Sequence, residues 1–285
     1  MARTKITPKF GCNRWGPAIG TQSQRFRLKP AVAERYSRQI LFEGIGKKGQ
    51  FNISKSFAVV VGAGAIGSAA AEMLIRAGIG RIRIIDKDFV ELSNLQRQSL
   101  FIEEDIGKAK AQAAAEKLAQ INSGAHVEPI IQEFSPENAE LLVSNADVVL
   151  DATDNMETRF AINDVCAKVG KPWIFAGAAG GTCMSMFVLP RRTPCLRCIF
   201  RHLPSDAKPP TAHTIGIASM TAHAAACLEV SRALNWLANG KFEPGLVYFD
   251  VWGNCIDTVK INRDKNCQVC GGKGNISITR TKKTK

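Results

Sequence analysis

The chain has 285 residues, of which 45% are hydrophobic and 22% are charged. These proportions are typical of a soluble globular protein and exclude wholesale disorder, a collagen-like repeat and a disulfide-stapled miniprotein. No stretch approaches the roughly 18 consecutive apolar residues that a membrane span requires, so we expect no membrane partner. Because no apolar signal-peptide core lies near the N-terminus, the predicted location is the cytoplasm.

The net charge of +13 is concentrated at the two ends of the chain. Residues 1–30 contain seven Lys or Arg and no acid, and residues 260–285 contain eight Lys or Arg and one acid, Asp264. These ends can act as solubilising segments, which we favour, or as a patch for an acidic partner such as RNA, which stays open. Residues 1–30 are predicted to form an irregular basic arm, and residues 273–285 a basic tail.

The first half of the chain after this arm alternates between two kinds of segment. Short runs rich in β-branched residues predict strands, and longer stretches with helical periodicity predict the helices between them. Such alternation predicts an α/β fold with a Rossmann-like, doubly wound and mostly parallel sheet. The expected strands are 57–61, 81–86, 127–131, 147–151 and 173–176, and the expected helices begin near Ala31 and span 65–77, 108–121, 136–143 and 158–169.

The pattern changes after residue 180. A strand-like segment at 184–189 precedes a Pro-rich stretch, a long helix is expected at 218–238, and two more strands are expected at 246–250 and 256–261. These strands are predicted to extend the parallel sheet in the antiparallel sense. We therefore divide the body of the protein into regions 31–180 and 181–272.

A glycine loop, Gly62-Ala63-Gly64-Ala65-Ile66-Gly67, directly follows the first expected strand and opens a helix. Here the first glycine permits a tight turn, the second lets the main chain approach a phosphate, and the third lets helix and strand pack closely. Asp86 ends the next expected strand, where a carboxylate can accept hydrogen bonds from a ribose. The pattern predicts a nucleotide site.

The polar segment 91–98 follows that strand where a dinucleotide-dependent enzyme would usually continue into a helix. The carboxyl ends of parallel strands meet at one edge of a sheet, so Asn94, Arg97 and Lys110 are expected close to the glycine loop, together with Asp154. The two cations and the amide suit a triphosphate, and the carboxylate suits Mg²⁺. Taken singly, Arg97 could make a surface ion pair, and Asp154 could cap a helix.

Five segments together resemble one family. They are RYSRQI (35–40), GAGAIG (62–67), SNLQRQ (93–98), GKAK (107–110) and TDN (153–155), and they are followed by two C-x-x-C pairs. The chain over residues 31–272 resembles the MoeB/ThiF adenylyltransferases, relatives of the ubiquitin-activating enzymes that serve molybdopterin and thiamine biosynthesis. The resemblance implies a homodimer that uses ATP and Mg²⁺ to adenylate the C-terminal glycine of a small ubiquitin-like sulfur carrier, releasing pyrophosphate.

The resemblance also implies a role for each motif residue. Residues 31–180 would form the ATP-binding adenylation region, and residues 181–272 would supply carrier-binding strands, a mobile loop and the metal site. The implied catalytic residues are Arg38, acting on the phosphates of the neighbouring subunit's site, and Arg97, Lys110 and Asp154, the last as Mg²⁺ ligand. The implied nucleotide contacts are Gly62, Gly64, Ala65, Gly67, Asp86 (ribose), Asn94, Arg97, Lys110, Asp154 and Asn155.

The chain departs from the family pattern at two positions. Ala65 stands where many relatives have a further glycine, and one methyl group at a helix start is expected to be tolerated. Ala212 stands where relatives often carry a cysteine that links covalently to the carrier. We therefore expect adenylation without a catalytic-cysteine thioester step, with sulfur supplied by a separate protein. Cys183 is the nearest other thiol in the sequence, and a cysteine at the start of a strand is more often inert.

Two C-x-x-C pairs, Cys195/Cys198 and Cys267/Cys270, provide four thiolates in a chain whose odd cysteine count does not suggest a disulfide framework. Four sulfurs around a tetrahedral Zn²⁺ form a closed structural site that leaves no position for a substrate. A redox-active pair is the weaker alternative, because neither pair is expected to open a helix after a strand.

Two other functions compete with carrier adenylation. A relative that activates a carboxylate on tRNA would suit the basic ends, but the cysteine pairs and the RYSRQ segment count against it. A non-catalytic nucleotide-binding scaffold is the other, and the presence of Arg38, Arg97, Lys110 and Asp154 argues against it. The sequence leaves open which carrier and pathway are served.

Overall fold

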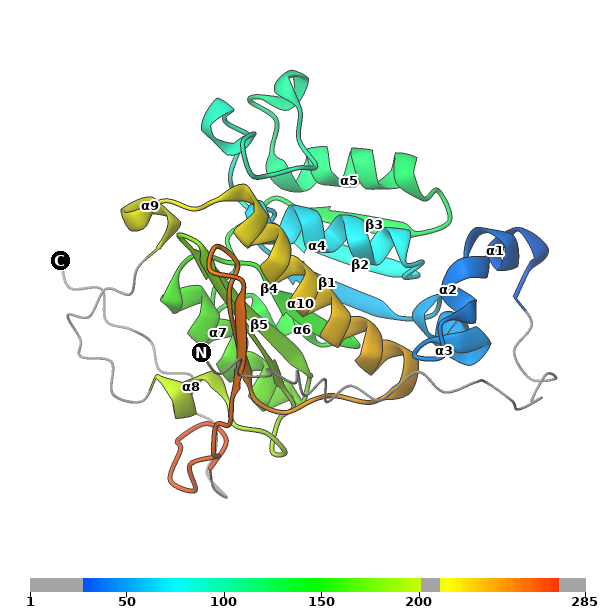
Figure 1. Ribbon diagram of the computed structural model, residues 1–285. Helices are drawn as coiled ribbons and strands as arrows, with labels where there is room; N and C mark the ends of the chain where they lie inside the picture. The colour runs from blue at the N-terminus through cyan, green and yellow to red at the C-terminus, as the bar shows by residue number, and fades with distance from the viewer. Residues whose placement is uncertain (1–27, 201–210, 272–285) are drawn as a thin grey trace, which may run out of the picture.

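The computed structural model describes residues 28–200 and 211–271, and Figure 1 shows their arrangement. The predicted basic arm, apart from its last three residues, and the predicted basic tail lie outside these ranges. Residues 201–210, within the predicted region 181–272, lie outside these ranges as well. The predictions made for these segments, and the division of the chain near residue 180, stay predictions.

One eight-stranded sheet forms the centre of the molecule, in the order β3-β2-β1-β4-β5-β6-β7-β8. The five strands from β3 to β5 are parallel, and β6, β7 and β8 continue the sheet in the antiparallel sense, as predicted. The strands are β1 (Phe57–Val61), β2 (Arg81–Ile85), β3 (His126–Ile130), β4 (Val148–Asp151), β5 (Trp173–Ala179), β6 (Thr182–Val188), β7 (Leu246–Asp250) and β8 (Cys255–Val259).

Helices cover both faces of this sheet (Figure 1). Side chains of α3, α4, α5 and α10 share one hydrophobic core with the sheet, and those of α6, α7 and α8 share the other. The helices are α1 (Pro30–Arg35), α2 (Ser37–Leu41), α3 (Gly46–Ile53), α4 (Ala65–Arg76), α5 (Lys110–Ile121), α6 (Ala139–Val143), α7 (Met156–Val169), α8 (Leu196–Ile199), α9 (Ala212–Ile215) and α10 (Ser219–Asn239), with 3-10 turns η1 (Leu92–Asn94) and η2 (Glu103–Asp105). None of the described helices is long and apolar enough to cross a membrane.

Two predicted helices differ from the observed ones. The helix expected to begin near Ala31 is divided into α1 and α2 at Tyr36, whose ring is buried against the end of α4. The helix expected at 136–143 begins only at Ala139, because the Asn138 side chain accepts a hydrogen bond from the main-chain N–H of Ser135 and holds a turn there. Side-chain hydrogen bonds of this kind compete with the helical main-chain pattern.

The topology brings several strand ends and helix N-termini together at one edge of the sheet. The parallel strands β1, β2 and β4 end at the same edge, and α4 and α7 begin there, directly after β1 and β4. Helix N-termini carry partial positive charge, and connections that leave neighbouring strands for opposite faces of the sheet open a crevice between them. This edge is therefore the usual ligand-binding position of an open α/β sheet.

Candidate nucleotide site and metal centre

The glycine loop connects β1 to α4, with Gly64 as the residue that precedes the helix and Ala65 as its first residue. Gly62 has φ +96, which favours glycine, and a Cβ atom there would lie 2.7 Å from the carbonyl oxygen of Ala152. A Cβ atom on Gly67 would lie 1.9 Å from the carbonyl oxygen of Gly62. Both glycines are therefore required by close main-chain contacts, and the helix N-terminus is left open for an anion.

Asp86 follows β2 and holds the glycine loop directly. Its Oδ2 accepts a hydrogen bond of 2.7 Å from the main-chain N–H of Ala63, and its Oδ1 accepts one of 2.8 Å from Asp88 N–H. Burial raises the pKa of this carboxyl group, while the hydrogen bonds and the Lys110 ammonium act in the opposite direction. Each oxygen keeps a further lone pair that can accept from a hydroxyl group.

The polar segment 91–98 folds into η1 and the turn after it. Asn94 is buried, and its Oδ1 accepts a hydrogen bond of 3.2 Å from Glu91 N–H, so much of this side chain braces its own turn. Half-buried Arg97 donates from Nη1 to the carbonyl oxygen of Ser93 at 2.9 Å. The predicted phosphate contacts of both residues stay predictions.

Gln98 was not among the predicted site residues, yet it lies against the glycine loop. Its side chain is buried, and its Nε2 is 4.0 Å from the position of a Cβ atom on Gly64. Its Oε1 has no hydrogen-bond partner in the described part of the chain. The segment SNLQRQ pointed to this stretch, but a glutamine in a turn carries no signal for burial.

Lys110 is the first residue of α5, a position where the helix dipole disfavours a cation. Its side chain is buried, and its Nζ lies 3.5 Å from Oδ2 of Asp88, which is itself exposed. The cation is thus held beside Asp86 by one exposed ion pair and by the packing of its stem. An ammonium group fixed at the positive end of a helix favours an anionic ligand.

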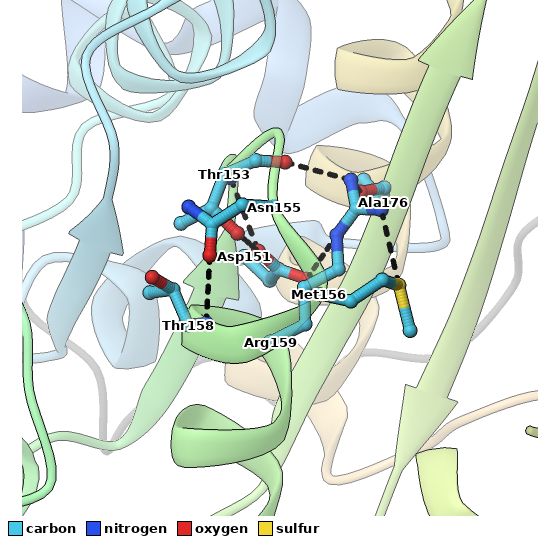
Figure 2. A network of polar contacts seen from close by, with 7 residues as sticks. All are labelled: Asp151, Thr153, Asn155, Met156, Thr158, Arg159 and Ala176. Carbon is cyan, nitrogen blue, oxygen red and sulfur yellow. Dashed lines mark hydrogen bonds and ion pairs between the residues drawn. The ribbon is translucent and has the colours of Figure 1, made fainter. Parts of the chain in front are cut away.

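The predicted TDN segment forms the turn between β4 and α7 (Figure 2). Asp154 is exposed, and the residue that caps α7 is Asn155, whose Oδ1 accepts a hydrogen bond of 2.8 Å from Thr158 N–H. The alternative interpretation of Asp154 as the helix cap is therefore wrong. The side-chain oxygen of Asn155 is the one that caps α7.

A buried network behind this turn was also missed from the sequence. Asp151 is completely buried at the end of β4, and its Oδ1 accepts hydrogen bonds from the N–H and the hydroxyl group of Thr153. Arg159 on the first turns of α7 lies beside it, with Nε 3.4 Å from Oδ2 of Asp151. The sequence shows an arginine four residues after Asn155, but only the tertiary fold determines that its side chain points towards Asp151.

Arg38 is not brought to the site within one chain. It is exposed on α2, and its neighbours fix that helix at the far ends of α4 and α5: Gln39 donates to the carbonyl oxygen of Ala77, and Asn122 donates to the Tyr36 hydroxyl group. Since α4 has 12 residues, it separates this position from the glycine loop by about 18 Å.

The four predicted metal ligands meet in one cluster. The Sγ atoms of Cys195 and Cys267 are 3.6 Å apart, those of Cys198 and Cys270 are 3.3 Å apart, and all four lie within 4.8 Å of one another. Sulfurs at about 2.3 Å from a tetrahedral ion would be about 3.8 Å apart, so the donor set and its spacing fit Zn²⁺. A hydrogen bond from Cys195 lowers the pKa of Cys270, and the same hydrogen bond together with burial raises the pKa of Cys195.

The first cysteine pair is anchored on α7. Cys195 precedes the one-turn helix α8, contrary to the expectation that neither pair opens a helix. Leu196 N–H donates to Oδ1 of Asn163 at 2.8 Å, and Arg197 makes a bidentate ion pair with Asp164. Because the sulfurs of this pair face those of the second pair, the arrangement favours a metal ion even though Cys195 lies at the start of a helix.

Fold and site together define an α/β nucleotide-binding protein with a closed four-cysteine centre. A family model described as "ThiF family" matches residues 36–269. The chain is 41% identical to the sulfur carrier protein ThiS adenylyltransferase of Bacillus subtilis, over 84% of this chain and 72% of that protein. It is 34% identical to the SAMP-activating enzyme E1 of Haloferax volcanii, over 88% and 93%. The chain belongs to the ThiF family, which confirms the predicted resemblance, and its enzyme class is adenylyltransferase.

Solved structures confirm the fold class. Escherichia coli MccB bound to MccA-N7isoASN superimposes with a TM-score of 0.75 over 83% of this chain and 74% of that chain, at 23% identity. A structure of the same protein with ATP gives a TM-score of 0.73 at 25% identity, over the same shares of the two chains.

Proposed function

We propose that this protein adenylates the C-terminal glycine carboxylate of a small ubiquitin-like sulfur carrier at the expense of ATP. The observation that carries the proposal is the gathering of the glycine loop, Asp86, Lys110 and the Thr153–Asn155 turn at one sheet edge. Relatives named as adenylyltransferases of sulfur carriers give the reaction its substrate class.

In the proposed reaction, a carboxylate oxygen of the carrier attacks the α-phosphorus of ATP. The bond between that phosphorus and the oxygen that bridges the α- and β-phosphates breaks. Pyrophosphate leaves with the bonding electron pair, and the acyl-adenylate remains. The glycine loop and Asp86 would hold the phosphates and ribose, and Lys110 and Arg97 would stabilise charge that grows on the leaving group. Mg²⁺, held by Asp154, would neutralise phosphate oxygens.

The proposal includes no thioester at the usual cysteine position. Ala212, the first residue of α9, has no thiol, and Cys183 is buried in β6. Burial raises the pKa of Cys183 to about 11, which disfavours the thiolate that would act as a nucleophile. A carrier adduct that forms with ATP and is released by a thiol reductant would contradict this part of the proposal.

The four-cysteine centre is proposed to hold Zn²⁺ in a structural role. Its thiols are mostly buried, and the chain between Cys195 and Cys267 would be closed by the ion. A tetrahedral site filled by four protein sulfurs has no position for substrate, so the reaction would take place at the sheet edge alone.

We further propose that the enzyme is a homodimer in which Arg38 serves the partner's site. The placement of α2 away from the glycine loop supports this role. An Arg38→Ala chain mixed with an Asp154→Ala chain would form heterodimers with one intact site, so a 1:1 mixture should recover about a quarter of wild-type activity. No recovery in a mixture shown to exchange subunits would contradict it.

The direct test is ATP–pyrophosphate exchange with a panel of small proteins that end in Gly-Gly, with tRNA as the comparison. Exchange with a carrier, abolished when its last glycine is removed, would support the proposal and identify the pathway. ATP consumption with tRNA alone would favour the tRNA-modifying alternative instead.

A further inference from the structure

Arg159 on α7 contacts the end of β4, the Thr153–Asn155 turn and β5 at the sheet edge (Figure 2). Its Nη2 donates to the carbonyl oxygen of Thr153 at 2.6 Å and to that of Ala176 in β5 at 3.2 Å. Its Nε faces Asp151 at the end of β4, and its guanidinium lies 5.1 Å from the centre of the Phe175 ring. One side chain on α7 therefore ties the Thr153–Asn155 turn to two neighbouring strands.

Ala152, the residue before this turn, and the main-chain nitrogen of Thr153 lie against the glycine loop. The main chain at Ala152 leaves no room for a side chain on Gly62, and the Ala152 methyl group lies 3.0 Å from where a Cβ of Gly67 would be. The turn is thus held between the glycine loop and the Arg159 guanidinium.

The charge on Arg159 is needed in this position. Asp151 is completely buried at the end of β4, and the Arg159 guanidinium faces its carboxyl group. A buried carboxylate without a cation is costly, and the guanidinium supplies one in a fixed planar geometry. Few side chains could bind two carbonyl oxygens and face a carboxylate at once.

We propose that Arg159 is a positioning residue of the nucleotide site, which fixes the Thr153–Asn155 turn so that the Asp154 carboxylate is held for Mg²⁺. This inference rests on the proposed function for the role of Asp154, but the rigidity of the turn is a property of the chain alone. Residues that orient a metal ligand typically affect metal affinity or activity by about 10–100-fold.

The test variant is Arg159→Lys, which keeps the charge but loses the planar fork. Arg83→Lys is the matched control, because Arg83 also pairs with an acid (Glu128), donates to a carbonyl oxygen (Leu142) and lies over an aromatic ring. The exposed fractions of the two arginine side chains are similar, 13% for Arg159 and 15% for Arg83. Arg83 is on β2, away from the turn.

The first measurement is amide hydrogen exchange in the nucleotide-free protein. In Arg159→Lys, peptides that contain Thr153 should exchange about 10-fold faster or more, while the Arg83→Lys protein should keep wild-type protection there. Equal protection in wild type and Arg159→Lys would overturn the inference, as would the same loss in both variants. If Arg159→Lys does not fold, Asp151→Asn carries the test, because it keeps the acceptor for Thr153 and removes the ion pair.

The second measurement is the Mg²⁺ dependence of ATP–pyrophosphate exchange with the carrier. Arg159→Lys should need about 10-fold more Mg²⁺ for half-maximal exchange, and this change should vanish when Asp154 is already Ala. An unchanged Mg²⁺ requirement would overturn the inference even if exchange is slower. Absence of exchange in the wild-type protein would instead count against the proposed function, with the hydrogen-exchange test unaffected.

Discussion

At the nucleotide edge, Asp154 and Asp88 are exposed and Arg97 is half-buried, whereas at the four-cysteine centre three of the four ligands are buried and face one another. The first region is assembled from side chains that face solvent and are held by short local contacts. The second region is closed on itself and joins segments 72 residues apart. A change in the first should alter chemistry more than stability, and a change in the second should do the reverse.

The largest effect is expected at the metal centre. Cys267→Ser should lose the bound metal and destabilise the protein by about 4 kcal/mol, the loop-closure contribution of a cross-link that spans 72 residues. Metal analysis and thermal unfolding would measure this. Retention of metal and stability would show that the cluster does not work as a cross-link, and Cys255→Ser, at an exposed thiol outside the cluster, is the control.

Asp154→Ala should have the opposite effect to Cys267→Ser, with a loss of activity and no loss of stability. Because the side chain is exposed, stability and metal content at the cysteine cluster should be unchanged, while ATP–pyrophosphate exchange should fall by roughly 100-fold or more. Asp88→Ala tests the neighbouring exposed acid, which pairs with Lys110, and should have a smaller effect. Normal exchange in Asp154→Ala would rule out the assigned Mg²⁺ ligand.

Glu229 is buried behind the nucleotide edge, and it tests whether a buried carboxyl group in this region lowers the free energy of unfolding. Burial, and then the negative charge of Asp151, raise the pKa of Glu229 well above 4.5. As pH rises above 4.5, the unfolded chain releases this proton and the native protein retains it, so wild-type stability should fall with pH. The slope of this contribution is about 1.4 kcal/mol per pH unit up to the native pKa.

Glu229→Gln should remove this contribution, so the variant should gain stability over the wild type as pH rises from 4.5 towards neutrality. Unfolding by urea at a series of pH values would measure the difference. A matched change at an exposed helical position, Glu116→Gln on α5, controls for the loss of a charge. Parallel pH profiles for wild type and Glu229→Gln would mean that the carboxyl group is ionised in the native protein.

The smallest effect is expected at Ala65, where relatives often carry glycine. Ala65→Gly should destabilise α4 by less than about 1 kcal/mol, because glycine loses more conformational freedom at the start of a helix. ATP binding should change little, since the side chain is a single methyl group. A large change in ATP affinity would show that this methyl group contacts the nucleotide.

Local patterns were sufficient for much of the fold and for part of the site. Gly62, Gly67 and Asp86 were predicted because a strand, a tight turn and a helix follow one another in sequence. The contacts of Gly67 with Gly62 and of Asp86 with Ala63 are made within the β1–α4–β2 segment. The alternative that Asp154 caps α7 was wrong, and it arose because two adjacent residues could each cap the helix. Only the main-chain conformation selects Asn155.

The residues that escaped prediction share another property. Gln98, Arg159 and Glu229 are buried or nearly buried polar side chains that lie against other segments of the chain, and in sequence they resemble ordinary surface positions of a turn or helix. Burial turns them into groups that must be satisfied or kept neutral. No local pattern reports that change of environment.

The sequence by itself determined the order of strands and helices, the glycine loop and the type of metal ligand, because each depends on residues close together in the chain or on side-chain chemistry. The tertiary structure decided how the two cysteine pairs meet, that Arg38 lies away from its own glycine loop, and that Arg159 supports the turn carrying Asp154. These depend on packing between distant segments, where the energy of a contact is set by burial and direction, which the order of residues does not contain.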